Sequence, residues 1–376
     1  MKAIGVLLLC TLLCCCKGSN DADSSIKCYN IEHMLKVEAK NLCIDSIFKD
    51  ISIIPLETSD DILIKKIINI HLYNDLLFVI HVDRCSVFDL KGNYLYDIGK
   101  RGNGPGEFTA SHPQLLFFSG DIVGLCETYH KTLFYTIDGQ FKYDITHFTA
   151  YETIKNIKQN VFVGIVGIES ERDANRLLFF DIKGNEIDSV QHYRHLSRED
   201  NVSWYIPDDA NLFVYNNNVY LKEGYNDTTF LISHDLKLIP EYIIATGKRS
   251  VNYEVRVLNP EKYGDGARSV IDFESDRYII LRNRGPGGFS GDRILIDKKN
   301  GKIESVLFKY NEDMAKLFED HLVLDKIIDN TPILKSIPPY FRICGVSEDG
   351  KTVFGYEVLI DKPYDNPVII MATIKE

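Results

Sequence analysis

The chain has 376 residues, of which 45% are hydrophobic and 26% are charged. This composition is typical of a folded globular protein and excludes a chain that is disordered throughout. The formal net charge of -11 argues against nucleic acid and anionic lipid surfaces as partners of the folded body, because like charges repel.

The N-terminus has the features of a lipoprotein signal peptide. Lys2 is followed by the apolar run AIGVLLLCTLLCCC, which is shorter than the roughly 20 apolar residues that cross a bilayer. The stretch LLCCCK resembles a lipobox, with Leu13 three residues before Cys16. The resemblance implies that residues 1–15 are removed and that Cys16 is lipidated. Cleavage before one of the two preceding cysteines, or an ordinary secretory signal, are the alternatives.

The residues after Cys16, KGSNDADSSIK, are polar and lack apolar periodicity, so we expect a flexible tether. More than one acyl chain on Cys16 would anchor the protein stably, whereas a single chain binds membranes marginally. The chain therefore divides into a signal peptide (1–15), a lipid-attached tether and lead-in (16–46) and a folded domain (47–376). The expected location is the cell envelope, as an outer-membrane lipoprotein on its periplasmic or surface side.

The cysteines outside the signal give no framework for disulfides or zinc. With Cys16 set aside as the lipidation site they number five, an odd count, are widely spaced and form no CxxC pair: Cys28, Cys43, Cys85, Cys126 and Cys344. No cofactor is predicted and the metal ligands, if any, are unknown. The pairs Asp60–Asp61 and Asp208–Asp209 would hold structural calcium only if other oxygens converged on them, and turns are the simpler interpretation.

One sequence unit recurs six times along the chain. It consists of an apolar alternation, a turn that contains aspartate, and a second alternation, and SVFDLKGNYLYDI is its clearest copy. The alternation predicts strands, and the Asp-Gly and Asn-Gly pairs predict tight hairpin turns. The copy without a glycine is the weakest. The turn aspartates are Asp89, Asp138, Asp181, Asp235, Asp297 and Asp349.

The spacing of these units predicts the fold. About 50 residues separate successive turns, which leaves room for two hairpins, or one four-stranded blade, per unit. Six blades in a closed ring also remove most exposed strand edges. We therefore expect an all-β, six-bladed β-propeller, closed by pairing of the strand-like segments 47–57 and 366–375.

One segment departs from the β pattern. In NEDMAKLFEDHLVLDKII the apolar residues lie near helical spacing, from Met314 to Ile328. Asn311 can cap the N-terminus, and Glu312 and Asp313 suit the first turn. We expect a short helix inserted between the fifth and sixth blades and packed on one face of the ring. A helix that docks a partner is the alternative.

Together these features resemble a family of six-bladed, NHL-repeat-like β-propeller lipoproteins of Gram-negative gut anaerobes. The segments that carry the resemblance occur in the family's order and cover nearly the whole mature chain: IIPLE, VFDLKGNYLYDIGKRGNGPGEF, LKEGYNDTTF and NPVIIMATIK. The resemblance implies a secreted, lipid-anchored propeller and adds little about activity.

The stretch RGNGPGEF is a glycine-rich loop that invites a phosphate-binding interpretation. Its glycines match neither the dinucleotide fingerprint nor a P-loop. We expect a structural role, in which the backbone passes close to the next blade and Phe108 anchors the loop. Arg101 and Glu107 are the binding candidates if the loop faces a ligand. The loop from Arg282 to Arg293 is interpreted in the same way.

Four further motifs contain candidate residues. His192 and His195 have a chelating spacing but lack further ligands, so exposed loop histidines are preferred. Ser290 lies in GFSGD, which is not a nucleophile elbow. Trp204 could stack on a sugar or receive a peptide, although packing between blades is preferred. Asp227, in YNDTTF, is a candidate ligand residue whose default role is turn hydrogen bonding.

No catalytic constellation is recognisable in the sequence. This favours a non-enzymatic module that binds a glycan, a peptide or an envelope protein, and that is itself monomeric. The alternative is a hydrolase or lyase whose site gathers residues from several blades at the mouth of the central channel, because fold does not fix function. A subunit of an envelope complex is a third hypothesis, for which a large exposed apolar patch would be the sign.

Overall fold

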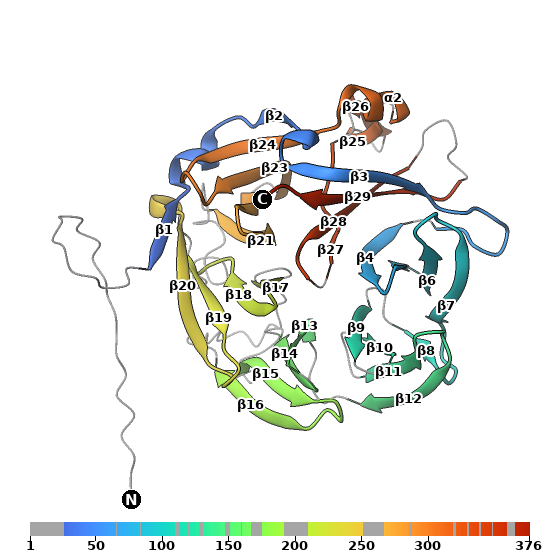
Figure 1. Cartoon of the computed structure of the whole chain (residues 1–376). Coiled ribbons are helices and arrows are strands. Elements are labelled where there is room, and N and C mark those ends of the chain that lie inside the picture. The colour runs from blue at the N-terminus through green and yellow to red at the C-terminus, as the bar shows by residue number, and fades with distance from the viewer. Residues whose placement is uncertain are drawn as a thin grey trace, which may run out of the picture.

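The computed structural model describes most of the chain after residue 25. The described residues are 26–64, 66–82, 84–109, 113–118, 121–127, 131–146, 151–158, 160–166, 175–191, 210–250, 267–285, 288–318, 321–328, 331–337, 340–347, 349–358 and 365–376. They form a six-bladed β-propeller, seen along its axis in Figure 1. The fold class expected from the repeats is confirmed.

The first three blades follow the chain in order, each with its strands numbered from the axis outward. Blade 1 contains β4 (Ile67–Tyr73), β5 (Leu76–His81), β6 (Arg84–Asp89) and β7 (Tyr94–Arg101). Blade 2 contains β9 (Gln114–Phe118), β10 (Ile122–Cys126), β11 (Lys131–Thr136) and β12 (Phe141–Thr146). Blade 3 contains β13 (Tyr151–Lys158), β14 (Val161–Val166), β15 (Asn175–Asp181) and β16 (Glu186–Gln191).

The other three blades complete the ring. Blade 4 contains β17 (Ala210–Tyr215), β18 (Asn218–Glu223), β19 (Thr228–Ile232) and β20 (Leu238–Ala245). Blade 5 contains β21 (Arg268–Glu274), β22 (Tyr278–Gly285), β23 (Gly288–Asp297) and β24 (Ile303–Lys309). Blade 6 contains β27 (Gly345–Val346), β28 (Thr352–Glu357), β29 (Val368–Ile374) and, from the other end of the chain, β3 (Phe48–Pro55).

The pairing of β3 with β29 closes the ring, as the sequence predicted. The two strands are antiparallel, with Ile54 opposite Ile369 and Phe48 opposite Ile374. Asn366, buried just before β29, fastens the chain that leaves β3. Its amide oxygen accepts a hydrogen bond from the Ile64 backbone N–H at 2.6 Å, and its amide nitrogen donates to two further backbone carbonyls in that segment.

The segment before β3 also belongs to the ring, although the sequence suggested only a lead-in there. We call residues Lys27–Pro55 the belt. Its strand β1 (Lys27–Asn30) pairs in parallel with β20, and β2 (Lys40–Cys43) pairs in parallel with β24. Two 3-10 helices, η1 (Glu32–Lys36) and η2 (Ile44–Ser46), lie within the same segment. Figure 1 shows the belt passing outside blades 4 and 5 before it enters blade 6.

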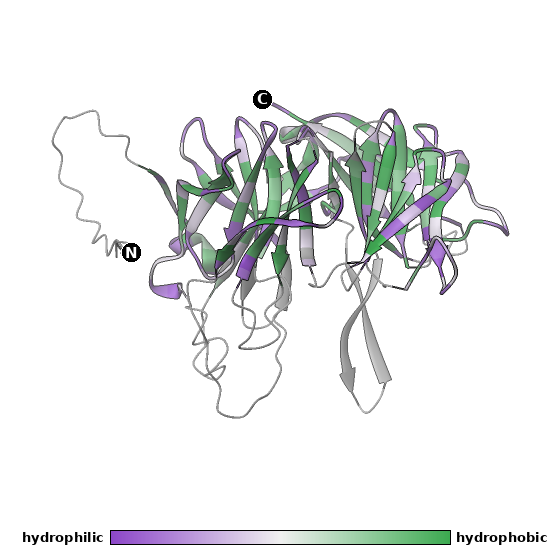
Figure 2. Cartoon of the chain, turned by 90° about the horizontal axis from the view of Figure 1, so that it is seen from below, coloured by the Kyte–Doolittle hydropathy of each residue, from purple (hydrophilic) through white to green (hydrophobic). Residues whose placement is uncertain are grey.

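The apolar core consists of six clusters, one between each pair of neighbouring blades. The cluster between blades 1 and 2, for example, joins Phe78 and Ile98 to Leu125 and Tyr135. Figure 2 shows the hydrophobic positions concentrated along the strands, with hydrophilic residues at the turns. Each blade is thus buried on both faces and depends on its two neighbours.

All six repeated units are hairpins, but the sixth has a different place in its blade. The first five connect the third and fourth strands, whereas the turn at Asp349 connects β27 and β28, the first and second strands. In blade 6 the third and fourth strands, β29 and β3, come from opposite ends of the chain, so they are paired without a turn between them. In the unit without glycine, Leu236 takes the left-handed backbone conformation, with φ of 63°.

The insertion between blades 5 and 6 is only partly helical. Helix α2 (Glu312–Leu317) begins at Asn311, whose side chain accepts a hydrogen bond from the Met314 backbone N–H as predicted. Beyond Leu317 the expected helix is wrong, because His321–Ile328 forms β25, which pairs with β26 (Thr331–Ile337). The backbone is already extended at Phe318, and its ring is buried in the core between blades 5 and 6.

No helix in the described part of the chain is long and apolar enough to cross a membrane. The five cysteines in the described part of the chain form no disulfide, and Cys85 and Cys126 are buried.

The closure can be tested at Gly92, in the turn between β6 and β7. Gly92 and Gly301 both have positive φ, of +87° and +72°. A methyl group at Gly92 would lie 2.0 Å from the carbonyl oxygen of Pro55 in β3, whereas one at Gly301 would meet nothing within 4 Å. Gly301→Ala should cost about 1 kcal/mol from backbone strain alone. Gly92→Ala should cost about 2 kcal/mol more, because β3 must move.

Chemical denaturation of both variants checks this prediction. Equal losses of unfolding free energy in the two variants would contradict the close approach of blade 1 to the closing strand.

Candidate functional site

The glycine-rich loop between β7 and β8 (Glu107–Phe108) is organised by its own glutamate. The Glu107 carboxylate accepts a hydrogen bond from the Gly104 backbone N–H at 2.8 Å and lies 3.3 Å from the Lys100 ammonium. These two contacts, the backbone one first, lower the pKa of Glu107. Phe108 is fully buried and packs between blades 1 and 2, so the expected anchoring role is confirmed. Arg101 is exposed.

Asp227 is also engaged within the fold. Its carboxylate accepts hydrogen bonds from the backbone N–H and the hydroxyl of Thr246, at 3.1 and 2.9 Å. Nearby, the Lys222 ammonium is completely buried and donates to the carbonyl oxygens of Glu223 and Asn226, at 2.7 and 2.6 Å. Burial lowers the pKa of Lys222 to about 8. Lys222 and Asp227, two charged residues of LKEGYNDTTF, thus both have structural roles.

The predicted binding residues do not form one site. Arg101 and Glu107 belong to blade 1 and Asp227 to blade 4. Trp204 lies outside the described residues, as do His192, His195 and the pair Asp208–Asp209. The side chain of Ser290 also lies outside them. Asp60 and Asp61 occupy an exposed turn between the bridged residues Ser59 and Ile62, as expected from the sequence.

A pocket of about 360 Å³ lies where the belt meets blade 4. Its lining comes from the end of β1, from η1 and from the 3-10 helix η3 (Gly247–Arg249), which follows β20. The lining residues are Asn30, Glu32, His33, Lys36 and Arg249. We call this the basic pocket.

Local hydrogen bonds hold the pocket wall in place. The Asn30 side chain accepts a hydrogen bond from the Glu32 backbone N–H at 3.0 Å, which fixes the turn immediately before η1. The Glu32 carboxylate then accepts a hydrogen bond from the Lys248 backbone N–H at 3.1 Å. This bond connects η1 to η3. The carboxylate can approach because residue 247 is glycine, where a Cβ atom would lie 2.0 Å from Glu32 Oε2. The Glu32 carboxylate therefore links the belt to blade 4 in addition to the pairing of β1 with β20.

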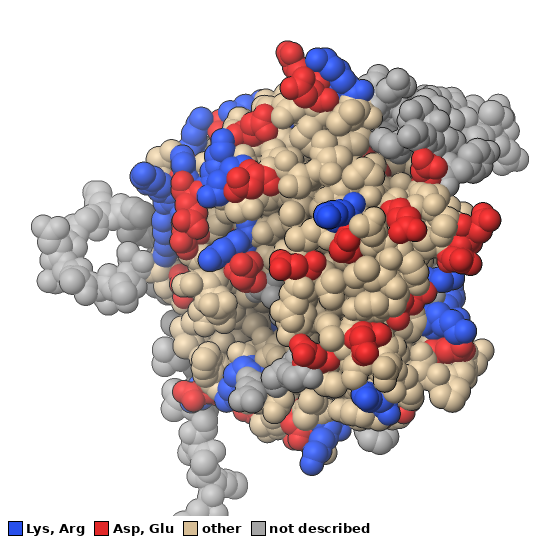
Figure 3. Space-filling model, turned by 45° about the vertical axis from the view of Figure 1, so that its right-hand side comes forward, with Lys and Arg blue, Asp and Glu red and all other residues tan. Residues whose placement is uncertain are grey.

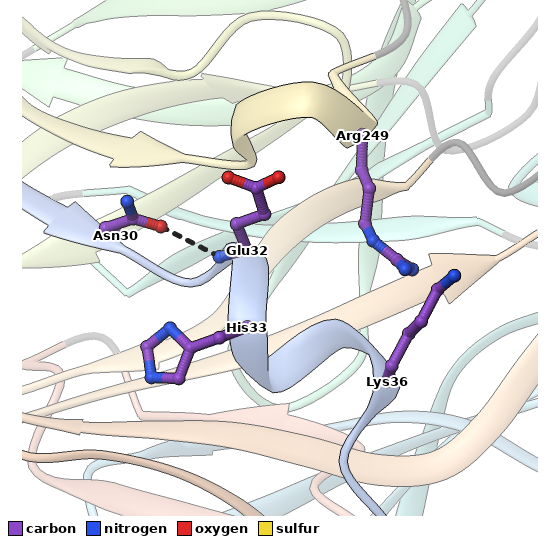
Figure 4. Close-up of a pocket in the computed structure, with 5 residues that line it drawn as sticks. All are labelled: Asn30, Glu32, His33, Lys36 and Arg249. Atoms are coloured by element: carbon purple, nitrogen blue, oxygen red, sulfur yellow. Dashed lines mark hydrogen bonds between the residues drawn. The ribbon is translucent and has the colours of Figure 1, made fainter.

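The charged side chains of the lining are two cations, Lys36 and Arg249, and one carboxylate, Glu32. Figure 4 shows the Arg249 guanidinium and the Lys36 ammonium directed toward one another, while the Glu32 carboxylate points to the η3 backbone. His33 also belongs to the lining, but its ring is directed away from these two cations in Figure 4. Two cations held on one wall favour an anionic group between them, and a guanidinium matches carboxylate and phosphate oxygens in particular.

Acidic and basic side chains are mixed on the face of the molecule that Figure 3 shows. No broad basic face is visible on this side. Within the described part of the chain, no group of three or more His, Cys, Asp or Glu side chains could hold a metal ion.

Sequence inspection missed a set of buried glutamates at the ends of second strands. Glu127, Glu223 and Glu357 end the segments VGLCE, VYLKE and VFGYE in blades 2, 4 and 6, and all three are less than a tenth exposed. The shared V-x-x-x-E pattern would have revealed them. Each accepts a hydrogen bond from the preceding blade.

The donors of these three bonds differ. Thr109 donates to Glu127 through its backbone N–H and its hydroxyl. Arg176 donates to Glu223 at 2.9 Å, and the Tyr310 hydroxyl donates to Glu357 at 2.8 Å. Because a buried carboxylate is costly unless it is paired, these groups fasten neighbouring blades together.

The comparison with protein families agrees with this architecture. A family model described as "Domain of unknown function (DUF4934)" matches residues 28–356. The chain belongs to this family. The match begins within β1, so the belt is part of what defines the DUF4934 family.

Two solved structures share the fold. A protein described as exported, from Bacteroides fragilis NCTC 9343, has a TM-score of 0.63 at 14% identity and covers 94% of this chain and 100% of its own. A member of the DUF4221 family from Bacteroides vulgatus ATCC 8482 has a TM-score of 0.50 at 11% identity, with coverages of 87% and 97%. At these identities the likeness shows the fold alone. No curated protein sequence matches the chain.

One buried histidine lies between blades 1 and 2. His71 on β4 packs edge-on against Phe117 of β9, and its Nε2 has no hydrogen-bond partner among the described residues. Burial, with a smaller effect of the Lys155 charge, lowers the pKa of His71 to about 3. His71 is therefore neutral near pH 7 and cannot act as a general acid there.

His71 should make the stability depend on pH. Between about pH 6.5 and 3 the unfolded state binds a proton at this position that the folded state does not, so folding weakens as the pH falls. In His71→Gln this contribution disappears. The unfolding free energy of the variant relative to the natural protein should rise by about 1.4 kcal/mol per pH unit from pH 6 to 4. Denaturant titrations across this range test it, and a constant difference would contradict the buried neutral state.

Proposed function

We propose that the protein is an exported, lipid-anchored β-propeller of the cell envelope that acts as a ligand-binding or protein-binding module. The signal-like N-terminus with Cys16 supports the anchor. The fold shared with a protein described as exported is consistent with the location. Glu127, Glu223 and Glu357 accept hydrogen bonds from neighbouring blades and so serve the scaffold. This supports a binding function over a catalytic one for the protein.

We further propose that the basic pocket is a ligand site for carboxylate or phosphate groups. The observation that carries this proposal is the convergence of Lys36 and Arg249 on one wall (Figure 4). The Glu32 carboxylate, which also lines the pocket, accepts a hydrogen bond from the Lys248 backbone N–H. Acidic glycans and phosphorylated headgroups present the anionic groups that such a pair would bind.

Titrations with galacturonate and with inorganic phosphate test the pocket. Arg249→Ala should weaken binding of either anion about ten-fold, because the bidentate contact is lost. Lys91→Ala is the matched control, since it removes one positive charge from the exposed turn of blade 1. Equal binding by the two variants, measured by calorimetry, would refute the pocket assignment.

Lipidation at Cys16 is tested by partition into a phase-separating detergent. Cys16→Ala should move the protein from the detergent phase to the aqueous phase, because the acylated residue is lost. Cys28→Ala is the matched control, since Cys28 is an exposed cysteine in β1. The control should stay in the detergent phase. A Cys16→Ala variant that also stays there would defeat the anchor assignment.

A further inference from the structure

Three short strands of this chain cover the outer edges of blades. β1 covers blade 4, β2 covers blade 5 and β8 covers blade 1, and each runs parallel to the strand that it joins. Each pairs with the last residues of the outer strand: Tyr242–Ala245 in β20, Val306–Lys309 in β24, and Lys100 and Arg101 in β7. Covering an outer edge at this end is therefore a repeated device of the fold.

The two belt strands also share a sequence pattern. Each has lysine at its first position and an apolar residue at its third, in the segments KCYN and KNLC. Tyr29 is 5% exposed and packs edge-on against Tyr242, with ring centroids 6.0 Å apart. Leu42 packs against the core between blades 5 and 6. The lysine lies opposite the first covered residue and the apolar residue opposite the third.

In blade 2 no described strand pairs with the corresponding outer edge. Its outer strand β12 is the last strand of its sheet among the described residues, and no strand lies outside it in Figure 1. A register shift follows Thr229 in blade 4 and Phe134 in blade 2. Thr229 pairs with Tyr242 and Phe134 pairs with Tyr143, so Tyr143 occupies the position of Tyr242.

The two equivalent tyrosines differ in exposure. Tyr242, beneath β1, is 6% exposed, whereas Tyr143 is 45% exposed. Tyr143 is held in place by stacking on Phe134, at 4.7 Å between ring centroids. Two residues further along, Ile145 occupies the position of Ile244, which lies opposite Tyr29 in blade 4. Blade 3 has a bare outer strand too, but Asp188 takes the tyrosine position there.

We propose that the outer edge of blade 2, residues Tyr143–Thr146 of β12, is a docking site for an extended segment of a partner protein. The segment pairs in parallel and has the pattern Lys-x-aromatic, with its lysine opposite Tyr143 and its aromatic ring over Ile145. Addition of a strand to an open edge uses backbone hydrogen bonds for affinity and alternate side chains for specificity. The basic residue suits a protein of net charge -11.

This surface is separate from the basic pocket, since the two lie on blades 2 and 4. A failure of one proposal therefore leaves the other standing.

The test uses the full chain and a fluorescent hexapeptide of residues Ile26–Ile31 with Cys28→Ser. The β1 strand of the protein itself occupies blade 4, so the peptide should bind the free edge of blade 2. Tyr143→Ala should weaken binding about ten-fold, whereas Ile187→Ala should leave it unchanged. Ile187 is the matched control because it is 48% exposed on β16, the outer strand of blade 3, which no described strand covers either.

A second measurement locates the peptide. Amide hydrogen exchange should slow at Tyr143–Thr146 when the peptide binds, because backbone groups at the edge become paired. A peptide that fails to bind, or that binds equally well to Tyr143→Ala, would overturn the proposal. So would a dimer in sedimentation that Tyr143→Ala converts to a monomer, because a second copy would then be the occupant.

Discussion

Burial of apolar side chains between neighbouring blades is the constraint on which this structure depends. Each blade is a small twisted sheet with two apolar faces, and neither face can be left in water. A linear row would expose one face at each end, so the row closes on itself. In the last blade three strands from the C-terminus join one strand from the N-terminus, and Asn366 fastens the chain that leaves β3. Stability is therefore shared around the whole circle.

The belt extends this dependence to the segment that precedes the first blade. Because β1 and β2 add to blades 4 and 5 on the way to β3, the N-terminal segment touches half of the ring. Glu32 links it to blade 4 at the basic pocket.

Charge in this protein has two separate structural settings. Between blades, carboxylates such as Glu223 and Glu357 are buried and paired with donors from a neighbour, which favours fixed geometry over proton transfer. At the surface, Lys36 and Arg249 stand together with their ends directed toward one another. The first arrangement holds neighbouring blades together, and the second places two cations in the lining of the basic pocket. This division is the basis of the proposed binding function.

The sequence by itself determined the blades, because alternation and turn residues act within a few positions along the chain. It predicted the hairpins, the partnership of the two terminal strands and the cap at Asn311 for that reason. It misjudged the segment after Leu317, where burial of Phe318 ends the helix and a hairpin replaces it. Only the tertiary structure brought Lys36 to Arg249 and left Tyr143 uncovered, because both depend on which distant strand lies against which edge. No local pattern encodes that choice.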